Sequence, residues 1–205
     1  MAETKPTVFV VDDESAMREA FTCLLEAEGL EVRTYESGEA FLAAYQPRQP
    51  GCLLLDVRMR GMSGLQLQAR LAQMEPTLPV IIITGHGDIS MAVQGMKAGA
   101  MDFLEKPVND KLLVERVRLA LEEDDRRGRE WQQRNAIATL LASLTVREQQ
   151  VLPLVVRGLP SKQIATKLGI TQKTVEAHRK HILDKMGVHN TPALVRVVTA
   201  AGLTL

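Results

Sequence analysis

The sequence is poor in aromatic residues and in cysteine. Only 3% of its 205 residues are aromatic, so the hydrophobic core must be built mainly from aliphatic side chains. The two cysteines, Cys23 and Cys52, belong to no CxxC pair or metal-ligand cluster, which excludes a cysteine-based metal site. We expect both to be reduced and to behave as small, buried hydrophobic residues.

Long hydrophobic runs are also missing. The segment from Met1 to Thr7 is polar and lacks the apolar stretch of a signal peptide. The longest apolar runs, such as Leu78 to Thr84, are far too short to span a bilayer. We therefore expect a cytoplasmic protein that makes no membrane contact.

The chain has no net charge, but its charges are divided unevenly along the sequence. From Ala142 onward there are 9 Lys and Arg residues against 3 Asp and Glu residues, so this part carries +6 and the remainder −6. The acidic part suggests a cation as its partner, and the basic part suggests nucleic acid.

Short apolar runs alternate with amphipathic stretches in the first part of the chain. The runs predict β-strands at Thr7–Val11, Leu30–Thr34, Cys52–Leu55, Pro79–Thr84 and Ala100–Leu104. The amphipathic stretches predict helices at Glu14–Glu28, Gly38–Tyr45, Leu65–Met74, Ile89–Lys97 and Asp110–Leu121. This alternation indicates an α/β doubly wound (flavodoxin-like) fold, in which helices cover both faces of a parallel five-stranded sheet.

The strand pattern stops at Glu122, which sets the domain boundaries. We predict a first domain over residues 1–122, a helical linker over 123–141 with Gly128 as a candidate hinge, and a second domain over 142–205. In the second domain every predicted element is a short helix, so we expect it to be all-α.

Polar residues follow the predicted strands where a doubly wound sheet places its ligand site. They are Asp12 and Asp13 after the first strand, Asp56 after the third, Thr84 at the end of the fourth, and Lys106 after the fifth. Carboxylates gathered in one cleft resist ionising together, and a divalent cation relieves their repulsion. Because the ligands are oxygens, with no His or Cys beside them, we expect Mg²⁺.

This set of residue types suits phosphoryl transfer, which depends on positioning and charge neutralisation. Asp56 can be the nucleophile that forms an acyl phosphate, and Asp13 with Asp56 can hold the metal. The Thr84 hydroxyl and the Lys106 ammonium can bind the oxygens of the transferred group. Any one of these residues alone would be an ordinary turn, cap or surface residue, so the prediction depends on their conjunction.

Residues 6–122 resemble the receiver domain of two-component response regulators, through Asp12-Asp13, Asp56, Thr84 and Lys106-Pro107. The resemblance implies that a sensor histidine kinase donates the phosphoryl group. It also implies that the Arg58 backbone carbonyl completes the metal shell, that Asp12 acts mostly through a metal-bound water, and that the Lys106–Pro107 peptide bond is cis.

The same resemblance assigns a switching role to Phe103. It implies that Thr84 moves toward the phosphate while Phe103, a core residue with two positions, rotates inward. The helix Asp88–Lys97 and the fifth strand would then form the surface of a homodimer. A role for His86 in setting the lifetime of the phosphate is an alternative to an ordinary loop position. Arg60 departs from the family, which usually has proline there, and this puts the rigidity of the loop in doubt.

Helix signals divide the second domain. Thr145 and Glu148 form a predicted capping box for a helix that runs to Val156. Ser161 is a predicted cap for a short helix through Leu168, and Thr171 for a third helix to about Met186. A helix, a tight turn containing Gly169, and a further helix are typical of a helix-turn-helix.

One face of the third helix carries exposed basic groups and a small residue, which fits a DNA major groove. On this face Lys180 can donate to guanine, Glu176 can accept from a cytosine amino group, and Ala177 can meet a thymine methyl. Alternatively, Glu176 pairs with Lys180 four residues later. The full predicted set of DNA-binding residues, including those placed for phosphates, is Lys162, Lys173, Thr174, Glu176, Ala177, Arg179 and Lys180.

Residues 142–202 resemble the LuxR/NarL-type helix-turn-helix, through Leu144-Thr145-x-Arg147-Glu148, Lys162-x-Ile164-Ala165, Leu168-Gly169-Ile170, Thr174-Val175-x-x-His178 and Ile182-x-x-Lys185. The resemblance implies a four-helix domain whose last helix, Thr191–Ala201, pairs two copies on DNA. His178 and His181 have no Cys partners, and we expect them to be structural and not metal ligands.

The two domains together resemble the FixJ subgroup of response regulators, which includes StyR/TodT-like regulators. The resemblance implies a phosphorylation-dependent regulator of transcription, an activator, that binds promoter DNA as a dimer and contacts RNA polymerase. One alternative is an aspartate-nucleophile phosphohydrolase, but that class needs Asp-x-Asp on its first strand and a cap domain. The other alternative is a DNA-binding protein whose receiver is vestigial.

Overall fold

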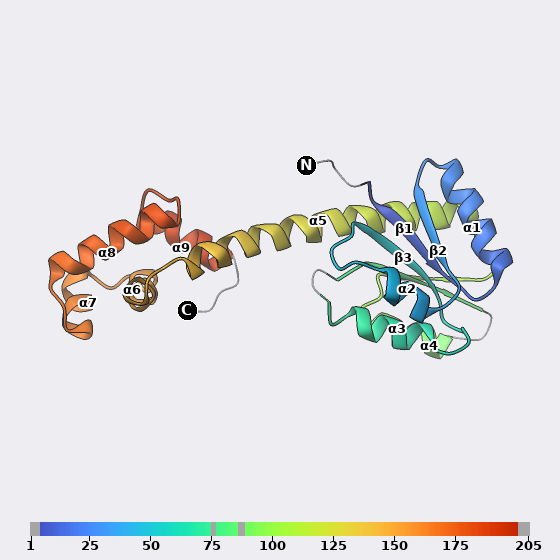
Figure 1. Ribbon diagram of the computed structural model, residues 1–205, viewed down its shortest axis with the longest axis horizontal. Coiled ribbons are helices and arrows are strands. Elements are labelled where there is room, and N and C mark those ends of the chain that lie inside the picture. The colour runs from blue at the N-terminus through green and yellow to red at the C-terminus, as the bar shows by residue number, and fades with distance from the viewer. Residues whose placement is uncertain (1–4, 75–76, 86–88, 201–205) are drawn as a thin grey trace. The chain divides into compact units, whose positions relative to one another are not determined.

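The computed structural model describes residues 5–74, 77–85 and 89–200 (Figure 1). The chain divides into two compact units, Met1–Arg129 and Glu130–Leu205. The first unit contains a five-stranded parallel sheet in the order β2-β1-β3-β4-β5. Its strands are β1 (Thr7–Val11), β2 (Glu31–Tyr35), β3 (Gly51–Asp56), β4 (Val80–Thr84) and β5 (Asp102–Glu105). The predicted doubly wound fold is confirmed.

Helices cover both faces of this sheet, as the all-buried strands β1, β3 and β4 require. One face packs against α1 (Ser15–Ala27) and α5 (Asp110–Ala142), through residues such as Leu25 and Val117. The other face packs against α2 (Gly38–Ala44), α3 (Gly64–Leu71) and α4 (Ile89–Lys97). Asp88, the expected start of α4, lies outside the described residues, as does His86.

Four of the seven aromatic residues form one cluster of ring contacts. The Phe9 ring makes edge contacts with the rings of Phe41 and Tyr45, with centroids 5.5 and 5.7 Å apart. Elsewhere the core is mainly aliphatic, as expected from the composition, with Phe21 as the buried aromatic residue on the other face of the sheet. The prediction that both cysteines are buried is correct for Cys52 and wrong for Cys23. Cys52 is buried in β3, whereas Cys23 lies on the outer side of α1 and is exposed.

The segment that follows the sheet is a single long helix. Helix α5 runs from Asp110 to Ala142 and passes through Gly128 without a break. Gly128, the candidate hinge, is therefore a helical residue in this structure. Charged side chains along the helix form ion pairs one turn apart, such as Arg127 with Glu123 and Arg129 with Asp125, and such pairs support an exposed helix.

The second unit is helical, with α6 (Val146–Val156), α7 (Ser161–Leu168), α8 (Gln172–Lys185) and α9 (Thr191–Ala200) around one apolar core. The Thr145–Glu148 capping box and the Thr171 cap are present. Ser161 is not a cap, because Pro160 occupies the N-cap position of α7 and Ser161 is its first helical residue. Gly169 ends α7 in the left-handed conformation, with φ 68°, which turns the chain toward α8.

Candidate functional site

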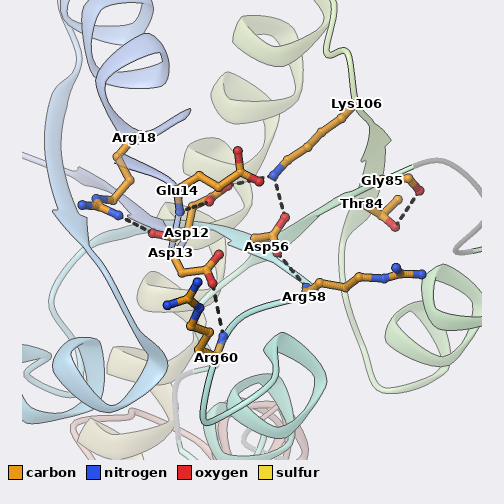
Figure 2. A network of polar contacts seen from close by, with 10 residues as sticks. All are labelled: Asp12, Asp13, Glu14, Arg18, Asp56, Arg58, Arg60, Thr84, Gly85 and Lys106. Atoms are coloured by element: carbon orange, nitrogen blue, oxygen red, sulfur yellow. Dashed lines mark hydrogen bonds and ion pairs between the residues drawn. The ribbon is translucent and has the colours of Figure 1, made fainter. Parts of the chain in front are cut away.

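The carboxyl ends of the strands bring the predicted acidic site together (Figure 2). Asp12 directly follows β1, Asp56 is the last residue of β3, and Thr84 is the last residue of β4. In the sheet register Asp56 lies opposite Ile83, one residue before Thr84. Asp12, Asp56 and Thr84 expose 1%, 6% and 4% of their surface, so the sheet holds all three in a largely desolvated position.

Lys106, which follows β5, connects the two buried carboxylates. Its ammonium lies 2.7 Å from Asp56 Oδ1 and 3.0 Å from Asp12 Oδ2 (Figure 2). The Lys106–Pro107 peptide bond is cis, as the resemblance implied. Residues 94 positions apart in sequence thus form one ion-paired cluster, which is the convergence that the strand pattern predicted.

Burial and neighbouring charges shift the pKa values of Asp56 and Lys106. Burial raises the pKa of Asp56 above its ordinary 3.8, although hydrogen bonding and charge from Lys106 oppose this shift. Burial acts to lower the pKa of Lys106, but the Asp56 and Asp12 carboxylates outweigh it, so that this pKa is raised above 10.5. The lysine is therefore a fixed positive charge beside Asp56 at neutral pH.

Backbone groups of the loop between β3 and α3 hold two of the carboxylates in place. The Arg58 N–H donates to Asp56 Oδ2 at 2.7 Å, and the Arg60 N–H donates to Asp13 Oδ2 at 3.3 Å. A proline at position 60 would lack this second donor. Asp13 thus lies beside the cluster and is less buried than Asp12 (Figure 2).

The donor chemistry of the site fits Mg²⁺. The three carboxylates of Asp12, Asp13 and Asp56 outnumber the Lys106 ammonium that lies between two of them. All of the side chains that face one another as possible ligands are oxygen donors, as Mg²⁺ prefers. A divalent cation would offset the excess negative charge that burial makes costly.

Two predicted residues lie apart from this ion-paired cluster. The Thr84 hydroxyl donates to its neighbour, the Gly85 carbonyl oxygen, at 3.4 Å. Phe103 exposes 46% of its surface, so it is an outward-facing residue of β5 and not part of the core. The inward position that the resemblance implies for Phe103 after phosphorylation is therefore not the one in this structure.

Sequence reasoning missed several residues that support the acidic site. The Glu14 N–H donates to Asp12 Oδ1 at 2.8 Å, and the Arg18 guanidinium donates to the Asp12 carbonyl oxygen at 2.7 Å. Gly64 begins α3 so close to β3 that a Cβ on it would lie 2.2 Å from the Asp56 carbonyl oxygen. An Asp that accepts from the N–H two residues later is a turn signal in a sequence, but the Gly64 contact had no signal in the sequence.

The second unit presents the predicted DNA-binding residues on α7 and α8. Five of them have exposed side chains, and Thr174 is partly buried at the start of α8, where its N–H binds the Thr171 cap. The exposed residues are Lys162, Lys173, Glu176, Ala177 and Lys180. Glu176 accepts a hydrogen bond from Gln172 at 2.9 Å, a different partner from the Lys180 that the alternative interpretation gave it.

Arg179 differs from the other predicted contacts. Its guanidinium donates to the Leu159 carbonyl oxygen at 3.4 Å and to Thr191 Oγ1 at 3.1 Å. These bonds tie α8 to the turn before α7 and to the start of α9. Within the unit, Arg179 therefore acts as a brace between three segments of the helix-turn-helix.

Both units match known families. Residues 8–118 match the response regulator receiver domain, and residues 142–198 match the bacterial regulatory proteins of the luxR family. The chain belongs to the response regulators. Receiver domains of this family generally bind Mg²⁺ at the phosphorylation site, which agrees with the oxygen donors gathered here. The receiver domain implies a sensor kinase as partner, and the luxR-type domain implies DNA binding.

Relatives of this response regulator match it along almost its whole length. Transcriptional regulatory protein FixJ of Azorhizobium caulinodans is 43% identical over 99% of this chain and 96% of its own. Response regulator protein TodT of Pseudomonas putida is 40% identical over 96% of this chain and 87% of its own. The solved structure of response regulator StyR matches 95% of this chain and 98% of its own, with 45% identity and a TM-score of 0.82.

These matches place the response regulator among the two-component transcriptional regulators of the FixJ/TodT type. Such relatives are regulators of transcription and not enzymes. Among the residues that the structure describes, no helix is long and apolar enough to cross a membrane.

Proposed function

We propose that Asp56 is the phosphoacceptor of this response regulator and that its phosphorylation controls DNA binding by α7 and α8. The observation that carries the proposal is the position of the Lys106 ammonium, 2.7 Å from Asp56 Oδ1. A fixed cation beside one oxygen of a buried carboxylate can neutralise the charge that a transferred phosphoryl group brings.

In the proposed reaction an Asp56 oxygen attacks the phosphorus of a phosphohistidine on the cognate sensor histidine kinase. The new P–O bond gives an acyl phosphate, the P–N bond breaks, and the electron pair of that bond returns to the imidazole. The Lys106 ammonium moves to an oxygen of the phosphoryl group, and the Thr84 hydroxyl donates to another. The Arg58 N–H keeps the Asp56 side chain oriented through its second oxygen.

We assign the Mg²⁺ ligands to Asp13, Asp56 and the Arg58 backbone carbonyl, with Asp12 acting through a water. When bound, the ion supplies positive charge that offsets the phosphate oxygens. Asp12 lies deeper than Asp13 and already accepts from Lys106 and from the Glu14 N–H. These contacts support an indirect role for Asp12 and a direct one for Asp13.

The signal would reach DNA through dimerisation. Three apolar side chains of α4 and β5 are exposed, namely Val93 at 47%, Met96 at 41% and Phe103 at 46%. Exposed apolar residues grouped on neighbouring elements favour a protein–protein contact. We propose that inward rotation of Phe103 reshapes this surface and that a homodimer forms, which raises the affinity for paired DNA half-sites.

On DNA, Lys180, Glu176 and Ala177 would contact base edges in the major groove. Lys162, Lys173 and the start of α8 at Thr174 would contact phosphates, whereas Arg179 would act near the backbone mainly by bracing α8. We further propose that the bound dimer activates transcription by contact with RNA polymerase. As a regulator that binds promoter DNA, the protein would act in the cytoplasm. It would not hydrolyse free phosphomonoesters.

The decisive experiment treats the chain with acetyl phosphate and Mg²⁺, then measures mass, oligomeric state and DNA selection. Wild type should gain one phosphoryl group, dimerise and bind DNA at least tenfold more tightly, whereas Asp56→Asn should do none of these. Asp125→Asn, an exposed aspartate of α5, is the matched control and should behave as wild type. Equal DNA affinity for wild type and Asp56→Asn after treatment would overturn the proposal.

A further inference from the structure

Two histidines of α8 and one glutamate of α6 meet at the surface of the second unit. One ligand atom from each of Glu148, His178 and His181 lies within 4.8 Å of the other two. The shortest contact given by the structure is 3.9 Å, between His181 Nδ1 and Glu148 Oε1. The acidic site of the receiver shares no residue with this cluster.

The fold fixes the three residues near one another. His178 and His181 are three residues apart on α8, so their side chains leave the helix on the same side. Glu148 is in the first turn of α6, and the apolar core to which Val151 of α6 and Ile182 of α8 both belong holds the two helices together. The sequence alone indicated a structural role for the two histidines, because Glu148 is thirty residues away and comes from another helix.

The carboxylate of Glu148 is held by other groups through one oxygen. Oε2 accepts from the Thr145 N–H at 2.8 Å and from Lys185 Nζ at 2.7 Å. Oε1 is the oxygen that faces His181. Hydrogen bonds from a second layer of residues orient a ligating carboxylate in many metal sites, and here they leave the histidine side of Glu148 as its ligating side.

We propose that Glu148, His178 and His181 form a binding site for a transition-metal ion of the Zn²⁺ class. Two imidazole nitrogens and one carboxylate oxygen suit Zn²⁺, Co²⁺ or Ni²⁺ and not Mg²⁺ or Ca²⁺. Three protein ligands leave a fourth tetrahedral position for water or another ligand. The Lys185 ammonium on Oε2 opposes the charge of the ion, so the affinity is lower than that of a four-ligand structural zinc site.

The geometry needs only side-chain movement to close around an ion. Metal–ligand bonds of about 2.0–2.1 Å in a tetrahedron place the ligand atoms roughly 3.3 Å apart. The side chain of His181 is 60% exposed and can turn toward Glu148, whereas the Glu148 side chain is 4% exposed and stays in place. Binding would join α6 to α8 and so stabilise the orientation of the helix that carries the DNA contacts.

Tag-free, full-length protein treated with EDTA and returned to excess Mg²⁺ is the sample for the test. The excess Mg²⁺ competes with other divalent ions for the receiver site. Titration with Co²⁺ should give the intense visible absorption of tetrahedral cobalt at one equivalent, and Zn²⁺ should displace it. Calorimetric titration with Zn²⁺ then gives the affinity, and repetition in Asp56→Asn checks that the receiver does not contribute.

His181→Ala should weaken Zn²⁺ binding at least tenfold, while His189→Ala, an exposed histidine outside the cluster, should leave it unchanged. Because His181 is exposed, its loss should not alter the circular dichroism. Glu148→Gln keeps an oxygen for the Thr145 N–H but removes the charge, and should also weaken binding tenfold. Equal binding by wild type and His181→Ala, equal binding by Glu148→Gln, or an octahedral Co²⁺ spectrum would each overturn the proposal.

Discussion

The backbones of Gly64 and Asp56 approach one another so closely that only glycine fits at position 64. A Cβ on Gly64 would lie 2.2 Å from the Asp56 carbonyl oxygen and 3.0 Å from Val57 Cα. Both neighbours are backbone atoms, which cannot rotate away as a flexible side chain can. The start of α3 is therefore pressed against the end of the strand that carries the acidic site.

Gly64→Ala should displace the start of α3 and the loop that follows Asp56. We expect a loss of about 1–3 kcal/mol in the free energy of unfolding of the receiver, because overpacking forces backbone shifts. The rate of phosphorylation by acetyl phosphate should fall more than tenfold, because the Arg58 N–H that orients Asp56 lies in the same loop. Calorimetry and phosphoprotein mass spectrometry measure the two effects.

Gly128→Ala is the matched control for this substitution. A Cβ at Gly128 would meet nothing within 4 Å, and the residue lies inside a continuous helix. Alanine should therefore stabilise the protein by about 0.5–1 kcal/mol and leave phosphorylation unchanged. Equal loss of stability in both glycine variants would contradict the proposed contact at Gly64.

Asp124 gives the receiver a predictable dependence on pH. Burial raises its pKa from 3.8 to about 6, although the Gly51 N–H, which donates to Oδ2 at 2.9 Å, and Arg127 oppose the shift. The folded state therefore holds the proton more tightly than the unfolded state. The stability that this proton contributes is present below pH 3.8 and is lost as the pH rises through about 6.

Asp124→Asn should remove this dependence, because the amide oxygen still accepts from the Gly51 N–H but carries no charge. At pH 8 we expect a gain of about 1–2 kcal/mol in the free energy of unfolding, discounted because Asp124 is partly exposed. At pH 4 the gain should be small. Calorimetric unfolding between pH 4 and 8 measures this gain in stability. A gain that does not depend on pH would contradict the raised pKa of Asp124 as its cause. The exposed Asp125→Asn is the control, with little change expected at either pH.

The sheet and its acidic site followed from short-range patterns in the sequence. Buried β-branched runs and intervening helices indicated the strands, and the rule that ligands bind at strand ends then placed Asp12, Asp56 and Lys106 together. Helix caps such as Thr145 and Thr171 were also predictable, because one side chain and one nearby N–H decide them. Ser161 failed because Pro160, the preceding residue, took the cap position.

Contacts that depend on tertiary packing had no such signal. The exposure of Cys23 and Phe103 depends on which side of an element faces the sheet. The continuity of α5 through Gly128 reflects helix-favouring neighbours and ion pairs that outweigh the cost of one glycine. Glu148 was predictable as a capping residue, but its positions beside Lys185 and His181 follow only from the packing of α6 on α8.

Lys185 and Lys180 lie on one helix but should have separable roles. Burial acts to raise the pKa of Glu148, but hydrogen bonds from Lys185 and Thr145 outweigh it and hold this pKa below 4.5. Lys185→Met would leave a buried, charged carboxylate without its ammonium. We expect a loss of about 1–3 kcal/mol in the stability of the second unit, with Lys185 itself partly exposed.

Lys180→Met removes an exposed charge instead, so unfolding should change by less than about 0.5 kcal/mol while DNA affinity falls. Urea unfolding followed by the fluorescence of Trp131, which belongs to the second unit, measures stability, and fluorescence anisotropy measures DNA binding. Loss of stability in Lys180→Met, or none in Lys185→Met, would contradict the assigned roles.

Arg179 and Lys173 should also have separable roles, since Arg179 braces the second unit and Lys173 is predicted to contact a phosphate. The Arg179 guanidinium donates through two nitrogens, to Leu159 and to Thr191, and a lysine ammonium on a flexible stem cannot reproduce this planar fork. Arg179→Lys should therefore lower the stability of the second unit by about 1 kcal/mol and leave the salt dependence of DNA binding unchanged, because the charge is kept. Lys173→Gln should leave stability unchanged and reduce the slope of log affinity against log salt by about 1. Full stability in Arg179→Lys would show that Arg179 does not brace the domain.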